Sequence, residues 1–142
     1  MDPAQASALV AGFTNWYHRV PLADGLVTPG VTDSGTVWTR LGLPDDMRGL
    51  RVLDIGTADG YFAFRAERAG AEVIAADIWR RPGFDICHRV LDSRVEHVVA
   101  PVWELSPARF GTFDVVLFLG VLYHLRDPLA ALHLLHDLCR GD

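Results

Sequence analysis

The sequence predicts an α/β fold in which a mostly parallel sheet is covered by helices on both faces. From Arg51 onward, short apolar runs alternate with helical patterns of about ten residues, which is typical of parallel strands joined by helical crossovers. A glycine-containing turn, Gly56 to Gly60, joins the first apolar run to the first of these helices. There is no internal repeat and no low-complexity tract, so a single α/β unit is expected.

The residues before the first strand are predicted to form a separate cap. An amphipathic helix is expected over Ala4–Tyr17, because bulky apolar residues recur there at three- and four-residue spacing. The Pro- and Gly-rich stretch Arg19–Ser34 is predicted to be a loop, and a short helix is expected over Thr36–Leu41. We therefore expect an N-terminal helical and loop segment over residues 1–48 and a sheet domain over residues 49–142.

Four strands and three helices are expected in the sheet domain. Pro128 at the start and Gly141 just past the end bound the last helix. The predicted strands are Arg51–Gly56, Glu72–Asp77, Val95–Ala100 and Phe113–Gly120, and the predicted helices are Tyr61–Ala69, Phe84–Leu91 and Leu129–Leu138.

Composition excludes several classes of protein. The 13 basic and 18 acidic residues give a net charge of −5, which offers no general attraction for nucleic acid. No apolar run reaches the roughly 18 residues of a membrane span, and the N-terminus lacks the basic start of a secretory signal. The two cysteines, Cys87 and Cys139, are expected to be free thiols in a cytoplasmic protein. His133 and His136 have the spacing of a metal pair but no third ligand, so we expect no metal.

The turn after the first strand is the main candidate for ligand binding. A glycine at a strand end lets the backbone turn sharply and lets a ligand approach closely, and the next helix directs free N–H groups toward the ligand. The dinucleotide pattern G-x-G-x-x-G would need glycine at Ala58 and Tyr61, which argues against a nicotinamide enzyme. The pattern present, D-x-G-x-x-x-G from Asp54 to Gly60, resembles motif I of S-adenosylmethionine methyltransferases.

An acidic residue at the end of the second strand supports an adenosine ligand. Asp77 closes that strand, and a carboxylate there can accept hydrogen bonds from both ribose hydroxyls. The alternative is an ordinary aspartate at a strand end. One of the two acidic residues of the turn, Asp54 or Asp59, is expected to receive the cationic amino group of the methionine part.

Three longer stretches resemble one particular group of methyltransferases. They are LVTPG, the segment from Val52 to Asp77 and GVLYHLRDPLAAL, and the W-Y-H sequence that begins at Trp16 adds to them. The likeness runs from about Trp16 to Leu138 and is to the tRNA wobble-uridine carboxymethyltransferases and their relatives. It implies a Rossmann-like class I methyltransferase fold and S-adenosylmethionine as the cofactor.

The resemblance also implies a set of cofactor contacts. The segment after the third strand would flank the adenine, although Trp103 is equally compatible with an ordinary core or surface residue. Asp24, Thr28 and Pro29 would lie in a loop over the cofactor, whereas by composition alone they would be turn formers. The expected cofactor-binding residues are Asp54, Gly56, Thr57, Ala58, Asp59, Gly60, Asp77, Ile78, Val102, Trp103, Leu119 and Gly120.

Tyr123 and His124 are the candidate catalytic residues. In this fold class the loop after the fourth strand borders the methyl group that is transferred, so both side chains are expected to contact the acceptor. An acceptor oxygen would need a base, and His124 is the candidate for that role. The alternative is structural: Tyr123 packs under the loop and His124 caps a turn.

One substitution argues against a carboxylated cofactor. The carboxymethyl-transferring members carry a lysine before the tryptophan that precedes motif I, whereas this sequence has Val37 before Trp38. Holding a buried carboxylate without that cation is unfavourable, so ordinary S-adenosylmethionine is expected. The predicted activity is methyl transfer to a small molecule or a tRNA base. The acidic balance favours the small molecule, whereas the family resemblance favours tRNA.

The number of strands is smaller than the full fold requires. Class I methyltransferases have seven strands in the order 3-2-1-4-5-7-6, and this sequence supplies the 3-2-1-4 part up to Cys139, where a fifth strand would begin. The apolar fourth strand would then lie at an open edge, which is a template for pairing with another chain. We expect either a stretch of a longer enzyme or a homodimer formed through this edge. A non-catalytic cofactor-binding or interaction domain is the alternative function.

Overall fold

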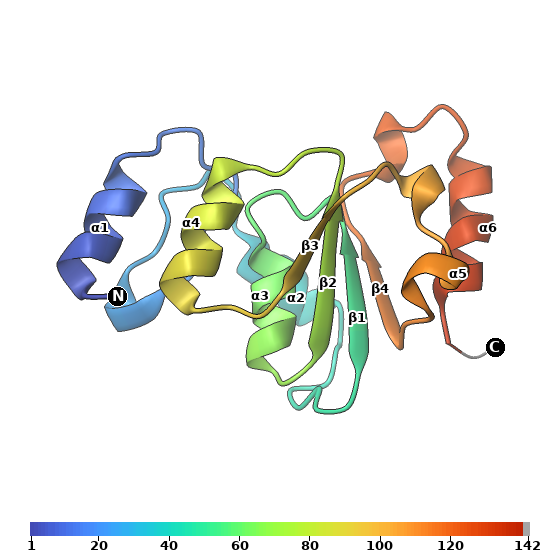
Figure 1. Cartoon of the computed structure of the whole chain (residues 1–142), viewed down its shortest axis with the longest axis horizontal. Coiled ribbons are helices and arrows are strands. Elements are labelled where there is room, and N and C mark those ends of the chain that lie inside the picture. Colours follow the sequence, from blue (N-terminus) through green and yellow to red (C-terminus); the bar gives the residue numbers. More distant parts are fainter. Residues whose placement is uncertain (141–142) are drawn as a thin grey trace.

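Four parallel strands form the centre of the molecule. The structure is a computed structural model that describes residues 1–140, except for the side chain of Asp24, so the predicted helix stop at Gly141 lies outside the described residues. Helices surround the sheet (Figure 1). The strands are β1 (Arg51–Ile55), β2 (Glu72–Asp77), β3 (Glu96–Val99) and β4 (Val115–Phe118), and the helices are α1 (Pro3–Ala11), α2 (Ser34–Arg40), α3 (Tyr61–Arg68), α4 (Pro82–Leu91), α5 (Pro107–Phe110) and α6 (Pro128–Leu138).

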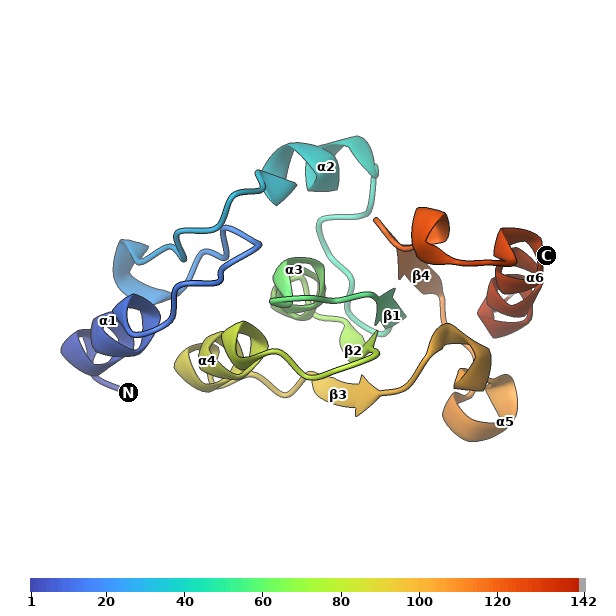
Figure 2. The same cartoon turned by 90° about the horizontal axis from the view of Figure 1, so that it is seen from above.

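The sheet has the strand order β3-β2-β1-β4, as the sequence predicts. All three neighbouring pairs are parallel, and the register places Ile55 of β1 opposite Ala76 of β2 and Phe118 of β4. The carboxyl ends of the strands therefore meet at one edge, which Figure 2 views from above. In a parallel sheet of this kind, ligands bind outside the carboxyl ends of the strands.

Alternate residues of each strand enter two separate cores. Val52 and Val73 belong to the larger core, which contains buried residues from α1, α2, α3 and α4. Leu53 and Ile74 point the other way and pack with residues of α6. Both faces of β1 and β2 are thus buried, which explains why their sequences are apolar at consecutive positions.

The first helix is shorter than the sequence suggests. The prediction of a helix over Ala4–Tyr17 is wrong in its second half, because α1 ends at Ala11 and Gly12 is its C-terminal cap. Trp16 is buried in the larger core and its indole nitrogen donates to the carbonyl of Val10 at 3.2 Å. The apolar spacing that suggested a continuous helix arises instead from a non-helical segment in which Trp16 enters the larger core and Phe13 packs against that core.

A buried carboxylate attaches this extended segment to the turn after β1. Asp59 is fully buried, and one of its oxygens accepts the backbone N–H groups of Tyr17 at 2.6 Å and His18 at 3.0 Å. Its other oxygen accepts the guanidinium Nε of Arg81 at 3.1 Å, and Arg81 also donates to the carbonyl of Asn15 at 3.0 Å. We call this set of contacts the Asp59 clamp. It fixes residues 15–18, which are far from Asp59 in sequence, beside the carboxyl ends of the strands.

The fourth strand lies at the edge of the sheet, as predicted. Beside it the chain that leaves α6 begins to run parallel to the segment before β4: the N–H of Phe113 donates to the carbonyl of Leu138 at 2.8 Å, and the N–H of Arg140 donates to the carbonyl of Phe113 at 2.7 Å. Part of this edge is therefore occupied by the chain itself. The homodimer and the division at residue 48 stay predictions, although buried residues from both sides of that division share the larger core.

Removal of one ring from the larger core should destabilise the protein strongly. Phe84 is fully buried, and its ring centroid lies 4.9 Å from that of Phe64 and 4.5 Å from that of His97. We expect Phe84→Ala to lower the free energy of unfolding by about 3–5 kcal/mol, because the cavity is not refilled. Urea unfolding measures this loss. Leu129→Ala, at a position 70% exposed on α6, is the control and should change little.

Loss of the charge at Asp59 should loosen the clamp. Asp59→Asn exchanges an acceptor oxygen for an NH₂ group and leaves the Arg81 guanidinium, whose side chain is 22% exposed, without its carboxylate. We expect a loss of about 3 kcal/mol in the free energy of unfolding and faster amide hydrogen exchange at Tyr17 and His18. Asp46→Asn, which breaks the exposed pair with Arg48, should leave both unchanged. Unaltered exchange in the Asp59 variant would show that other contacts fix the segment.

Candidate functional site

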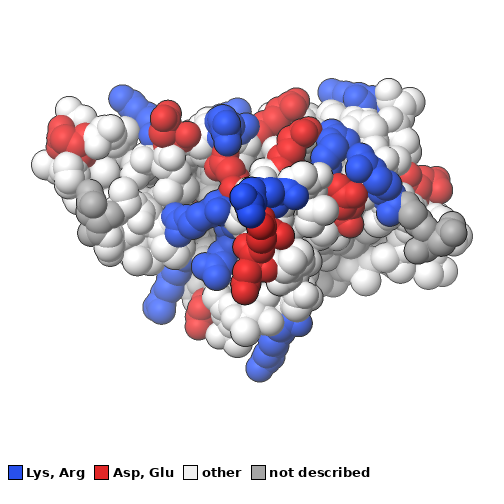
Figure 3. Space-filling view, turned by 90° about the horizontal axis from the view of Figure 1, so that it is seen from below, with Lys and Arg blue, Asp and Glu red and all other residues white. Residues whose placement is uncertain are grey.

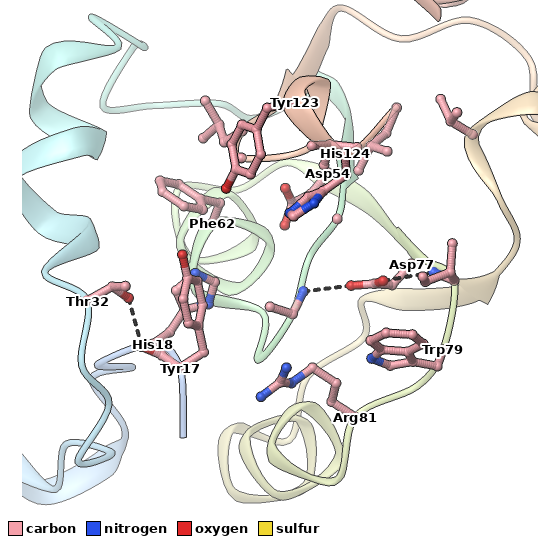
Figure 4. A pocket seen from close by; sticks show the side chains of 18 of the residues that line it. Tyr17, His18, Thr32, Asp54, Phe62, Asp77, Trp79, Arg81, Tyr123 and His124 are labelled. Carbon is pink, nitrogen blue, oxygen red and sulfur yellow. Dashed lines mark hydrogen bonds between the residues drawn. The ribbon is translucent and has the colours of Figure 1, made fainter. Parts of the chain in front are cut away.

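A cavity of about 930 Å³ lies at the carboxyl ends of the strands. Its wall is built by the turn after β1, the ends of β2 and β4, the segments that follow β3 and β4, and the N-terminal segment with α2 (Figure 4). Of the predicted site residues, eleven line it: Asp54, Gly56, Ala58, Asp77, Ile78, Val102, Trp103, Leu119, Gly120, Tyr123 and His124.

The turn after β1 needs glycine for a steric reason. Gly56 has φ of +76°, and a Cβ at this position would lie 2.4 Å from Cγ2 of Val121. The side chain of Val121, in the segment after β4, can therefore pack against the turn only because position 56 carries no Cβ. At the other end of the turn, Gly60 has φ of +89° and a Cβ there would meet the ring of Phe64 at 2.3 Å. Gly60 thus serves helix packing and does not line the cavity.

Two backbone N–H groups, one from the turn after β1 and one from the next residue, position the carboxylate of Asp77. One carboxylate oxygen accepts the N–H of Ala58 at 3.0 Å and the other accepts the N–H of Ile78 at 2.7 Å, as Figure 4 shows. These bonds join the end of β2 to the turn after β1 and fix the direction of the carboxylate. Each oxygen keeps a further lone pair, so the group can still accept hydrogen bonds from a ligand in the cavity.

Asp54 is almost completely buried, but it reaches the cavity. Its Oδ2 accepts the hydroxyl of Thr57 at 2.7 Å. Burial raises the pKa of this carboxyl from 3.8 to about 6; the Thr57 hydroxyl and the backbone N–H of Ala63 lower it, and the charge of Asp77 raises it. Asp54 therefore carries a negative charge at neutral pH that a cation in the cavity would stabilise.

Three predicted site residues lie behind the cavity wall. Thr57 uses its hydroxyl on Asp54, and Gly60 packs against Phe64. Asp59 has both oxygens engaged in the Asp59 clamp and no exposed side-chain surface. Of the two acidic residues that were candidates for an amino group, only Asp54 faces the cavity.

Apolar side chains flank the cavity beyond Asp77. Ile78 and Trp103 are 57% and 47% exposed, whereas Val102 is buried in the smaller core. Trp103 lies in a short 3₁₀ turn, Val102–Glu104, directly after β3. Trp79, which the sequence analysis did not select, follows Ile78 and is also exposed at the rim. This end of the cavity is suited to a flat, apolar ring.

Tyr123 and His124 lie at the opposite side of the cavity. They occupy a 3₁₀ turn, Leu122–His124, and their ring centroids are 4.3 Å apart. Tyr123 is 75% exposed, and its hydroxyl bends back to within 3.4 Å of the position that a Cβ of Gly120 would take. Neither ring is packed into the protein core, so the alternative in which Tyr123 packs under the loop is not what the structure shows.

Several lining residues were missed by the sequence analysis. Tyr17, His18, Thr32 and Phe62 form the side of the cavity next to α2, and Arg81 lies below them. The Trp-Tyr-His sequence marked the family resemblance but suggested no role in the site. Its place at the cavity depends on the Asp59 clamp, a long-range contact that no local pattern reveals.

None of the helices within residues 1–140 is long and apolar enough to cross a membrane. Within the same range, no three His, Cys, Asp or Glu side chains gather as a metal ion would require.

Solved structures resemble this chain over most of its length. The N-terminal domain of EvdMO1, crystallised with S-adenosylhomocysteine, superposes with a TM-score of 0.70 at 24% identity and covers 93% of this chain and 60% of that one. The 1,6-didemethyltoxoflavin-N1-methyltransferase of Burkholderia thailandensis superposes with a TM-score of 0.59 at 25% identity, over 100% of this chain and 61% of that one. The class I methyltransferase fold is thereby confirmed.

Sequence relatives and a family pattern agree with the fold. The tRNA U34 carboxymethyltransferases of Pseudomonas paraeruginosa and Azotobacter vinelandii are 35% and 36% identical, over 70% and 72% of this chain. The chain spans about a third of the length of these curated relatives, namely 32% and 33%. The family described as "Methyltransferase domain" matches residues 36–142. The chain therefore belongs to the methyltransferase domain family.

Proposed function

We propose that this chain forms the cofactor half of the active site of an S-adenosylmethionine-dependent methyltransferase. The observation that carries the proposal is the pair of carboxylates, Asp54 and Asp77, which face one cavity from the ends of adjacent strands on either side of the Gly56 turn. The cavity has the size of a site for a small organic ligand. Relatives with the same fold are crystallised with S-adenosylhomocysteine.

The residues present fit the cofactor in chemistry. Asp77 would accept the ribose hydroxyls, and Ile78, Val102 and Trp103 would enclose the adenine. Asp54 would receive the ammonium of the methionine part. Leu119 and Gly120 at the end of β4 would border the sulfur, while the backbone of Gly56 and Ala58 would lie beneath the ligand. Three residues would act indirectly, from behind the cavity wall. Thr57 would orient Asp54, Asp59 would hold residues 15–18, and Gly60 would allow α3 to pack.

The charges around the cavity favour a cationic cofactor. Among the described residues that line it, Arg81 is the one arginine, and it is paired with Asp59. Val37 lines the cavity where the carboxymethyl-transferring members have lysine, and Trp38 is buried in the larger core. The whole sequence contains no lysine. A further carboxylate on the cofactor would have no free cation here, so we propose ordinary S-adenosylmethionine.

The proposed chemistry is an in-line displacement. Bound S-adenosylmethionine supplies an electrophilic methyl group on a sulfonium. The chain's own contribution is to orient the ligand through Asp54 and Asp77 and to exclude water with its apolar walls. Tyr123 and His124 are placed to contact the acceptor, and His124 would take a proton from an acceptor hydroxyl.

A small molecule is the acceptor that the described surface favours. Figure 3 shows basic side chains interspersed with acidic ones on the face seen from below. Ion pairs such as Arg51–Glu72 and Arg140–Asp114 join some of the described arginines to carboxylates. Such a mixed surface attracts a polyanion weakly. A tRNA base is the second candidate, because relatives about 35% identical to this chain are tRNA U34 carboxymethyltransferases.

Binding of S-adenosylhomocysteine tests the proposal. We expect calorimetry to show micromolar binding to the wild-type chain and a loss of at least about tenfold in affinity for Asp77→Ala, because the ribose hydroxyls lose a charged acceptor. Asp92→Asn is the control: Asp92 is exposed with φ of +50°, a conformation that asparagine tolerates. A folded wild-type chain without affinity, or an Asp77 variant with full affinity, would contradict the proposal.

The affinity should also depend on pH through Asp54. Its pKa of about 6 lies above the ordinary 3.8, so the unliganded protein takes up a proton there as the pH falls through about 6. An ammonium binds the ionised carboxylate, and affinity for S-adenosylhomocysteine should therefore fall by up to roughly tenfold per pH unit below pH 6. Titrations between pH 5 and 8 measure this. Asp54→Asn should bind more weakly at pH 7.5 and show a flat profile; a profile equal to that of the wild type would exclude Asp54 as its source.

A further inference from the structure

His18 is a buried imidazole at the wall of the cavity. The residue is 4% exposed, and its ring packs between aromatic neighbours, with centroid distances of 4.9 Å to Tyr17, 6.1 Å to Tyr61 and 5.8 Å to Phe62. Its backbone N–H belongs to the Asp59 clamp. The ring is therefore held in one place beside the turn after β1, on the side of the cavity next to α2 (Figure 4).

The two ring nitrogens of His18 have different surroundings. Nδ1 is shielded from solvent and has no hydrogen-bond partner among the described residues, whereas Nε2 is not shielded in this way. A proton on Nδ1 would be a buried donor without an acceptor, which is unfavourable, so the neutral ring carries its proton on Nε2. Burial lowers the pKa of His18 to about 4; the charge of Asp59 raises it and that of Arg81 lowers it. At neutral pH the ring thus presents an uncharged N–H donor to the cavity.

The proposed cofactor has one group that the described cavity does not otherwise satisfy. Its ribose and ammonium have Asp77 and Asp54, but its α-carboxylate needs donors. Arg81 already donates hydrogen bonds from Nε to the carboxylate of Asp59 and from one Nη to the carbonyl of Asn15. The hydroxyl of Thr32 donates to the carbonyl of Tyr17 at 2.8 Å. His18 lines the cavity as well, and among the described residues its ring has no hydrogen-bond partner, so its N–H is available beside the turn on which the methionine part would lie.

We propose that His18 donates its Nε2–H to the α-carboxylate of the cofactor's methionine part. This inference rests on the proposed function and adds a recognition residue from the N-terminal segment to it. The carboxylate is then bound by a neutral donor in a site whose one arginine among the described residues, Arg81, is already paired with Asp59. The Asp59 clamp sets the position of that donor.

Calorimetric titration with two matched ligands tests this role. The first ligand is S-adenosylhomocysteine, and the second is its decarboxylated analogue, which keeps the adenosine, the sulfur and the ammonium. His18→Phe keeps a ring in the aromatic cluster and removes the donor. We expect this variant to bind S-adenosylhomocysteine roughly 10- to 100-fold more weakly than wild type and to bind the analogue with a change of less than about twofold. His18→Gln, which restores an N–H donor, should recover part of the loss.

The analogue also reports whether each variant is folded, since its binding needs an intact cavity but not the donor. His97→Phe is the matched control, because His97 is a half-buried ring packed on Phe84 outside the cavity, and both ligands should bind it as they bind wild type. Equal losses for the two ligands in His18→Phe, or no loss for either, would overturn the role of His18. Failure of the wild-type chain to bind either ligand would instead overturn the proposed function.

Discussion

The Asp59 clamp is the interaction on which the shape of the cavity depends. A fully buried carboxylate is costly to desolvate, and it persists because two backbone N–H groups and a guanidinium satisfy its oxygens. Those three donors come from the N-terminal segment and from the start of α4, whereas Asp59 itself belongs to the turn after β1. One side chain thus joins the three parts of the chain that surround the methionine end of the proposed site. It fixes the backbone of Tyr17 and His18 relative to the sheet, together with the packing of the His18 ring on Tyr61 and Phe62 of α3.

Three aspartates near the same sheet edge have different roles because their partners differ. Both oxygens of Asp59 accept hydrogen bonds from protein donors, so this residue has a structural role. Asp77 accepts two backbone N–H groups but keeps lone pairs toward the cavity. Oδ2 of Asp54 accepts a hydrogen bond from the Thr57 hydroxyl, and burial raises the pKa of this carboxyl to about 6. The cavity therefore combines the carboxylates of Asp54, Asp77 and Asp33 with a paired arginine, and this balance suits a ligand that carries positive charge.

Much of the sheet could be predicted from sequence because its signals are local. The apolar runs defined all four strands, and their order followed from the family resemblance. Motif I and Asp77 were identified because their function depends on short spacing. The second half of the first helix was predicted wrongly: its apolar spacing resembled that of a helix, but Gly12 ends α1 and Asp59 accepts the backbone N–H groups of Tyr17 and His18 in the non-helical segment that follows. Asp59 was predicted to bind the ligand, and the Asp59 clamp was not predicted, because the partners of Asp59 are more than twenty residues away from it in sequence.

A crystal structure of the chain grown with S-adenosylhomocysteine would test the central claim most directly. The account predicts the ribose hydroxyls on the carboxylate of Asp77, the adenine beside Ile78 and Trp103, and the ammonium at Asp54. It also predicts that the Asp59 clamp keeps the same contacts in the complex. Ligand density elsewhere on the molecule, or a cavity that stays free of ligand at saturating concentration, would contradict the assignment of this cavity as the cofactor site.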